Sequence, residues 1–237
     1  MARRRTRGAL ATLVAIVVLL AVAVGLDALA RTVVERQAAQ ALQQRLGTSQ
    51  PLSVSIGGWP FSLALITGTA SNVTVTAPQL TLSRNGQEVT VSDAEAVATS
   101  VHDVRRPAEA VAGTLRVTAT VSWAEVSRLA GVTISSAGGD RAKFTDTINL
   151  LGADVSVTIS AVPTIDPASH SLVLGDPRAG VAGVQIPASA LASVTGSLAS
   201  KIDLPAPVGL SYDSVQASMA GLRVVLGGTG VRLSALG

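Results

Sequence analysis

The sequence contains no cysteine, two histidines and few aromatic residues, namely two Trp, one Tyr and two Phe. The absence of cysteine excludes disulfide bonds, thiolate catalysis and cysteine-based zinc sites, and it is compatible with either side of a membrane. With so few aromatic side chains, the chain also lacks a platform on which nucleic-acid bases stack. The fold therefore has to form without covalent cross-links and with an aliphatic core.

Charged residues are scarce too, at 14% of the chain, and the formal net charge is +3. Four of the 18 basic residues are Arg3, Arg4, Arg5 and Arg7, which leaves 14 basic residues against 15 acidic ones, or −1, in the rest. A domain without an excess of basic residues offers no electrostatic surface to nucleic acid. We therefore expect no nucleic-acid partner.

An uncharged run of 19 residues, Gly8 to Leu26, follows the arginine cluster directly. This pattern is typical of a secretory signal or a signal anchor with a cytoplasmic N-terminus, and the run is long enough to span a bilayer. We expect residues 1–26 to form this segment and residues 27–237 to form one domain on the extracytoplasmic side. Because Ala28-Leu29-Ala30 resembles a cleavage site, a secreted form cleaved before Arg31 stays an alternative to a single-pass membrane protein.

An amphipathic helix is predicted directly after this run, ended by Gly47. Its apolar positions follow the 3.6-residue period of a helix. They are Leu26, Leu29, Ala30, Val33, Val34, Ala38, Ala41, Leu42 and Leu46. An alternating strand, Leu52 to Ile56, comes next and ends at Gly57-Gly58-Trp59-Pro60-Phe61. We expect Phe61, Leu63 and Leu65 to extend this strand on one face, with a bend at Gly68.

Alternating apolar and polar residues predict about nine strands in the whole chain. Hairpin turns are expected at Asn85-Gly86 and around Gly138-Gly139-Asp140. Ser122 and Glu125 have the spacing of a capping box, which predicts a short helix ending near Gly131. A second amphipathic helix is predicted to begin at Pro187. The fold class is therefore α+β with mostly antiparallel pairing.

The sequence shows no pattern of a known catalytic centre. It has no Gly-x-Ser-x-Gly elbow and no His-Glu-x-x-His helix, and Gly227-Gly228-Thr229-Gly230 lacks the lysine of a phosphate-binding loop. His102 and Asp103 are neighbours on a predicted strand, where their side chains point to opposite faces. We expect no catalytic residue, metal site or cofactor, although spacing does not exclude a site assembled from distant residues.

The order of motifs at both ends of the chain resembles one known family. The helix, the short strand, Gly57-Gly58-Trp59-Pro60-Phe61, the Gly68 bend and Val73-Thr74-Val75-Thr76-Ala77 resemble the opening of the actinobacterial LmeA-like phospholipid-binding family. Ile202-Asp203-Leu204-Pro205, Gly209-Leu210, Val215 and Gly221-Leu222-Arg223-Val224 resemble its closing segment. The resemblance covers roughly residues 27 to 235 and departs from the family at Ser62-Leu63-Ala64-Leu65, after the Pro-Phe.

This resemblance implies a tubular lipid-binding fold, in which a long, strongly curved antiparallel sheet wraps around the N-terminal amphipathic helix. It also implies an acyl-chain cavity between sheet and helix, and a role in the cell envelope linked to the length of mannan chains. The expected partners are phospholipid, or another acyl or isoprenoid lipid, and the membrane. The expected cavity lining is Leu29, Val33, Val34, Ala38, Ala41, Leu42, Leu46, Phe61, Leu63 and Leu65.

Three further residues are expected at the membrane or at the cavity mouth. Trp59 suits a membrane interface or a cavity mouth, whereas Trp59 and Phe61 together suit a plug that closes the end of the tube. Arg105 and Arg106 suit anionic head groups, or form an ordinary solvated loop. The alternative function is a structural envelope protein whose filled β domain binds another protein or cell-wall glycan.

Overall fold

The computed structural model describes residues 27–44, 48–58, 61–84, 87–104, 106, 109–150, 153–180 and 206–236. Residues 27–44 form the N-terminal helix. The other elements, in chain order, are β1 (Ser53–Gly57), α2 (Phe61–Thr67), β2 (Thr69–Arg84), β3 (Gln87–His102), β4 (Val111–Ser122), α3 (Trp123–Ala130), β5 (Thr133–Gly138), β6 (Arg141–Leu150), β7 (Ala153–Ile165), β8 (Leu172–Gly180), β9 (Ser211–Ala217), β10 (Gly221–Arg232) and the 3-10 helix η1 (Leu233–Leu236). The segment expected to form the second amphipathic helix, beginning at Pro187, lies outside the described residues.

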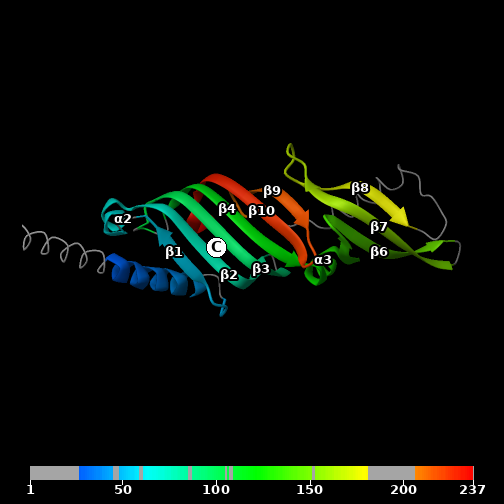
Figure 1. Ribbon diagram of the computed structural model, residues 1–237, viewed down its shortest axis with the longest axis horizontal. Coiled ribbons are helices and arrows are strands. Elements are labelled where there is room, and N and C mark those ends of the chain that lie inside the picture. The colour runs from blue at the N-terminus through cyan, green and yellow to red at the C-terminus, as the bar shows by residue number, and fades with distance from the viewer. Residues whose placement is uncertain are drawn as a thin grey trace, which may run out of the picture.

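The strands form two antiparallel sheets. The large sheet has the order β1-β2-β3-β4-β10-β9, and the small sheet has the order β5-β6-β7-β8. The two sheets follow one another along the molecule, with α3 between them and the N-terminal helix beside β1 (Figure 1). The predicted α+β class with antiparallel pairing is confirmed, whereas the single sheet expected from the sequence is divided into two among the described residues.

Both predicted hairpins are confirmed by the pairing of the strands beside them. Arg84 of β2 pairs with Gln87 of β3, so two residues connect these strands as the Asn-Gly signal indicates. Gly138 of β5 likewise pairs with Arg141 of β6. Local turn chemistry thus sets the register of the longest strand pair in the large sheet.

Most apolar residues of β3 reach one face of the large sheet although their alternation changes phase twice; Val97 lies on the other face. The residues that share the first face form three groups that are out of phase with one another: Val89 and Val91; Ala94, Ala96 and Ala98; and Val101. Asp93 and Ser100, which lie between the groups, have φ angles of 49° and 50°. The pairing of β3 with β4 shifts by one position between Ser92 and Glu95, so a bulge at Asp93 accounts for the first change of phase. At Ser100 the pairing with both neighbouring strands continues without a shift. Opposite Ser100, a Cβ on Gly113 would lie only 2.9 Å from the Ser100 Cβ, so glycine makes room there.

The expectation that Phe61, Leu63 and Leu65 continue a strand is wrong, because these residues lie in α2. Asp27, which is distant in sequence, accepts hydrogen bonds from the first two backbone N–H groups of α2 and so caps the helix. Gly68 then ends α2 with a φ of 73°, and its N–H donates to the carbonyl of Ala64 at 2.9 Å. Gly68 is therefore a helix C-cap and not a bend within a strand.

The short helix predicted after Ser122 is confirmed as α3. The Ser122 hydroxyl accepts a hydrogen bond from the N–H of Glu125 at 3.3 Å, and Gly131 ends the helix with a φ of 67°. The Glu125 carboxylate instead accepts a hydrogen bond from the N–H of Thr90 in β3 at 3.0 Å. One half of the capping box therefore forms, and the other half ties α3 to the large sheet.

The large sheet does not enclose the N-terminal helix, since no described residue of this helix is fully buried. The helix lies along the sheet and presents one half-buried side to it (Figure 1). Because the hydrogen bonds of Asp27, Arg31 and Glu35 go to residues on β1, the loop after it and α2, the helix is attached at the β1 edge and not inside the sheet. In the part of the chain described, no helix has both the length and the apolar character needed to cross a membrane.

Candidate functional site

One face of the large sheet is apolar across its full width. A single row of paired residues crosses the six strands in the order Val54, Val75, Ala96, Val117, Leu226 and Tyr212. The row below it contains Val73, Ala98 and Leu115. Most of these residues belong to or border the hydrophobic core of the molecule; Val54 is also buried, and Val75 is half-buried. We call this surface the apolar face.

The middle of the apolar face is built from small side chains. Ala94, Ala96 and Ala98 follow one another along the central strand β3. Ala94 and Ala96 are half-buried and Ala98 is buried, while their neighbours across the strands are mostly Val and Leu. A strip of methyl groups therefore runs along β3 between larger aliphatic residues.

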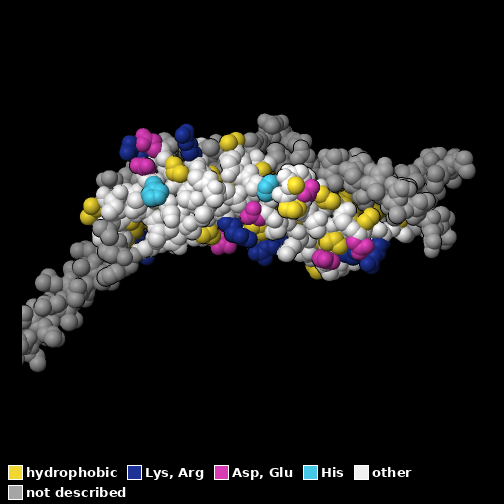
Figure 2. Space-filling view, turned by 90° about the horizontal axis from the view of Figure 1, so that it is seen from above, with side chains coloured by type: hydrophobic (Ala, Val, Ile, Leu, Met, Phe, Trp, Pro, Cys, Tyr) yellow, Lys and Arg dark blue, Asp and Glu magenta, His cyan; other side chains and the backbone are white. Residues whose placement is uncertain are grey.

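The opposite face of the large sheet is polar. The row next to Ala96 on that side contains Thr76, Glu95 and Thr118, and the hydroxyls of Thr99 and Thr114 lie 2.6 Å apart. Seen from above, basic and acidic side chains lie next to one another in small clusters (Figure 2). The alternation within each strand therefore separates an apolar side from a solvated side.

The N-terminal helix is attached to the β1 edge by charged side chains. The two carboxylate oxygens of Asp27 accept hydrogen bonds from the N–H groups of Phe61, at 2.9 Å, and Ser62, at 2.7 Å. These two backbone hydrogen bonds lower the pKa of Asp27 below its ordinary value, and the one from Phe61 has the larger effect. One turn later, Arg31 donates to the carbonyl of Gly58, and its guanidinium carbon lies 5.7 Å from the centre of the Phe61 ring.

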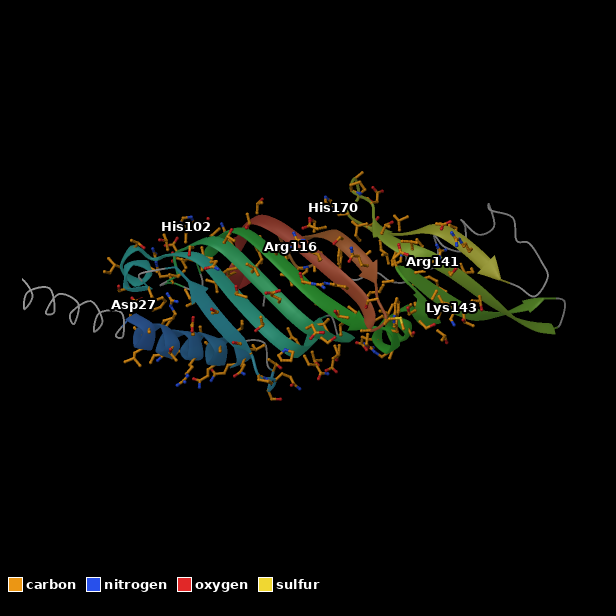
Figure 3. All side chains as sticks on the ribbon, viewed as in Figure 1. Asp27, His102, Arg116, Arg141, Lys143 and His170 are labelled. Carbon is orange, nitrogen blue, oxygen red and sulfur yellow. The ribbon has the colours of Figure 1, made fainter. Side chains whose placement is uncertain are left out.

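Glu35 completes this attachment. Its carboxylate accepts a hydrogen bond from the N–H of Ile56 at 2.7 Å. Ile56 lies on β1, which is an edge strand of the large sheet, so Glu35 satisfies a backbone group that no further strand covers. Asp27, Arg31 and Glu35 recur every four residues and form one polar line on the side of the helix that faces the sheet. Figure 3 shows Asp27 at the end of the molecule where α2 lies.

The helix residues expected to line a cavity lie on two different sides of the helix. Val34, Ala38 and Leu42 are half-buried and share the side that carries Arg31 and Glu35. Leu29 and Val33 are 66% and 53% exposed, which places them on the opposite side, and Ala41 is exposed too. Among these residues, the structure therefore brings only Val34, Ala38 and Leu42 towards the large sheet.

The other expected site residues gather at the end of the molecule that carries α2, as far as they are described. Phe61 is 2% exposed and lies beneath Arg31. Arg106 forms ion pairs with Asp103 at 3.4 Å and Glu109 at 2.7 Å, and its side chain is 65% exposed. Leu46, Trp59 and Arg105, and the side chains of Leu63 and Leu65, lie outside the described residues.

The two histidines occupy separate parts of the molecule. His102 is the last residue of β3, and the Nδ1 atom of His170 lies 3.1 Å from the Tyr212 carbonyl oxygen, beyond the large sheet (Figure 3). Within the described residues, no group of three or more His, Asp or Glu side chains is arranged to hold a metal ion. The ion pair of Arg141 with Asp176, at 2.8 Å, connects β6 with β8 of the small sheet, and Arg178 pairs with the same Asp176 within β8 at 3.0 Å.

Sequence reasoning missed the main surface of this site. The central alanines on β3 and the charged line of Asp27, Arg31 and Glu35 were not among the expected site residues. The alternation of Ala with Glu, Val and Thr from residue 94 to residue 99 is the signal that could have found the alanines. No local signal could have found Asp27, whose partner Phe61 lies 34 residues away.

The fold and its apolar face define an α+β protein with a large antiparallel sheet that is aliphatic on one face. The family model described as "LmeA-like phospholipid-binding" matches residues 25–226, so the chain belongs to this family. The match begins just before the N-terminal helix, reaches into β10 and includes all of β1 to β9. The resemblance recognised in the sequence is thereby confirmed. No curated protein and no solved structure matches the chain.

Proposed function

We propose that the chain binds a phospholipid, or another acyl or isoprenoid lipid, with its hydrocarbon chain lying in an apolar cavity formed by the apolar face and closed along one edge by the N-terminal helix. The observation that carries this proposal is the family match over residues 25–226, which includes β2, β3 and β4 with their apolar residues. Val34, Ala38 and Leu42 supply the helix side of the cavity. The family is a lipid-binding family, and we propose no catalytic step.

The free energy of such binding follows from the burial of methylene groups. Each methylene removed from water contributes about 0.8 kcal/mol, so a chain of about 16 carbons contributes on the order of 10 kcal/mol. This contribution needs an apolar surface and no specific polar group along the chain. The row from Val54 to Tyr212 provides such a surface across the sheet, and the small side chain of Ala96 provides space at its centre.

We further propose an extracytoplasmic location next to the membrane. The arginines at positions 3, 4, 5 and 7 precede the uncharged run that ends at Leu26, which is the order expected for a cytoplasmic N-terminus. The domain then lies outside the membrane, either anchored by this run or released by cleavage before Arg31. The family resemblance also favours a role in the cell envelope, in which the protein supports the assembly of lipoglycan mannan.

The experiment that tests lipid binding enlarges a small side chain at the centre of the apolar face. Ala96→Leu adds a bulky side chain there, whereas Val97→Leu adds one methylene at the next residue, which lies on the opposite face. The full chain and both variants are purified from membranes, and bound lipid is counted by native mass spectrometry. We expect Ala96→Leu to lower the lipid bound per chain by about tenfold, and Val97→Leu to leave it unchanged.

Two results would contradict this proposal. The first is a wild-type chain that carries no lipid after purification and binds none from phospholipid vesicles. The second is an Ala96→Leu variant that loses stability but keeps its lipid. The second result would show that the apolar face is a filled core, as expected for the alternative of a structural envelope protein that binds a protein or cell-wall glycan.

A further inference from the structure

Three of the six large apolar side chains that are exposed among the described residues lie at one end of the molecule (Figure 1). Leu29 and Val33, on the first turns of the N-terminal helix, are 66% and 53% exposed, and Ile66 on α2 is 71% exposed. α2 and the beginning of the N-terminal helix lie at the same end of the elongated molecule (Figure 1). We call the surface made by Leu29, Val33 and Ile66 the apolar tip. Large side chains of this kind in water indicate a surface with a partner.

The two elements of the apolar tip are fixed to one another. Asp27 holds the first turn of α2 by accepting hydrogen bonds from the N–H groups of Phe61 and Ser62. Leu29 lies two residues after Asp27, within the same turn of the N-terminal helix. At the other end of α2, the carbonyl of Gly68 accepts a hydrogen bond from the N–H of Val104 at 3.1 Å. The apolar tip is therefore held rigidly on the large sheet.

The outward side of the N-terminal helix changes from apolar to polar along its length. After Val33, the exposed side chains on this side are Arg36, Gln37, Gln40 and Gln44. The apolar part is thus limited to the first two turns, which are about 10 Å long. A partner that covers only the first two turns ends at a plane that crosses the helix axis. A bilayer surface ends in this way, whereas a groove parallel to the helix would cover the whole length of the helix.

The sequence before the helix identifies this partner. The uncharged run from Gly8 ends at Leu26, directly before Asp27. If this run lies in the bilayer, as the proposed function assumes, the apolar tip is the part of the domain nearest to the membrane. We propose that Leu29, Val33 and Ile66 insert into the interface of that bilayer, at the depth of about 5–10 Å that amphipathic surface helices reach. The domain then sits on its lipid supply in a fixed orientation.

The absence of cysteine makes this proposal directly testable, because one introduced cysteine is the only thiol in the chain. The variants Leu29→Cys and Ile66→Cys carry a fluorophore at the apolar tip. Met219→Cys, at a position that is 80% exposed between β9 and β10, is the matched apolar control. Gln40→Cys is the control on the same helix. The full-length chain is reconstituted into vesicles of phosphatidylcholine and phosphatidylglycerol that contain a nitroxide-labelled phosphatidylcholine.

We expect the lipid nitroxide to quench the labels at positions 29 and 66 at least about twofold more than those at positions 40 and 219. Iodide in the water should quench the labels in the opposite order. Equal quenching by the lipid nitroxide at all four positions would overturn the proposal. Labels at positions 29 and 66 that are shielded from both quenchers would overturn it too, because protein and not lipid would then cover them.

A second measurement separates the apolar tip from the lipid-binding site itself. The double variant Leu29→Ser, Ile66→Ser should take up labelled phospholipid from these vesicles several-fold more slowly than the wild type, with unchanged occupancy at equilibrium. Met219→Ser is the control. An unchanged rate would argue against the apolar tip even where lipid binding is established. If only the Ala96→Leu variant loses its lipid, this result bears on the proposed function and not on the apolar tip.

Discussion

Asp27 connects two segments that are far apart in the sequence. Its carboxylate caps α2 in place of a residue next to that helix, and the backbone hydrogen bonds from Phe61 and Ser62 lower its pKa. A lowered pKa means that the folded chain prefers the charged carboxylate. The stabilisation is therefore complete above the ordinary pKa of 3.8, and it is lost as the pH falls through the lower value in the folded chain.

Replacing Asp27 by Asn tests this capping contact. Asparagine keeps the size of the side chain but has only one acceptor oxygen and no charge. We expect the hydrogen-exchange protection of the Phe61 and Ser62 amides to fall on the order of threefold at neutral pH. Asp103→Asn is the control, since Asp103 lies at the same end of the molecule and makes only a long, exposed ion pair with Arg106. Unchanged protection in the Asp27 variant would mean that α2 does not depend on this cap.

Residue-level contacts were the least accessible to sequence reasoning. The periodicity of the helix places Leu29, Val33 and Val34 within one broad apolar arc, and it contains no information on which side the sheet will cover. That choice depends on Arg31 and Glu35, which bind groups on the loop after β1 and on β1 itself. The charged residues Arg31 and Glu35 thus lie on the side of the helix that faces the protein.

At the scale of elements, α3 was predicted correctly and α2 was not, for a physical reason. The N-cap of α3 is Ser122, the residue directly before the helix, and its C-cap is Gly131, so both signals are local. The residues of α2 alternate in hydrophobicity in a way that also suits a strand, and the cap comes from Asp27 on another helix. Short helices that are stabilised by distant residues are not visible in local patterns.

Glu125 links α3 to the large sheet and gives a prediction for this element. Its carboxylate accepts hydrogen bonds from Arg128, at 2.7 and 3.0 Å, and from the N–H of Thr90, and the Arg128 contact is the main cause of its lowered pKa. The stabilisation is present above the ordinary pKa of Glu125 and is lost as the pH falls through its value in the folded chain. Acid should therefore loosen the contact between α3 and β3.

The variant Glu125→Gln should unfold at lower urea concentration at neutral pH, with a loss of about 1 kcal/mol in the free energy of unfolding. The difference from the wild type should shrink as the pH falls below the ordinary pKa of 4.5 and disappear below the lower value in the folded chain, because Glu125 of the wild type is then protonated as well. Glu109→Gln, which removes an exposed partner of Arg106, should change the free energy of unfolding little. A loss of stability in Glu125→Gln that is the same at all pH values would refute the assigned role of the charge.

At the scale of the whole molecule, composition and alternation were sufficient for the α+β class and the antiparallel pairing. They did not reveal two sheets, because the pairing within the β5–β8 hairpins resembles that of the other hairpins in the sequence. The backbone irregularities at Asp93 and Ser100 also hid the continuous apolar face, since the alternation changes phase at each of them. The division into two sheets nevertheless matters for function, because the proposed lipid lies on one of them.

This division leads to a prediction for the whole chain when its lipid is removed. A ligand that binds only the native state stabilises the elements it contacts, and its removal increases local opening there. We expect the backbone amides of β2, β3 and β4 to exchange about tenfold faster in delipidated protein than in a reference sample that is saturated with lipid. The amides of β6 and β7 should change little, and so serve as the internal control. Equal acceleration in both sheets would indicate global destabilisation, and acceleration confined to the small sheet would place the lipid away from the apolar face.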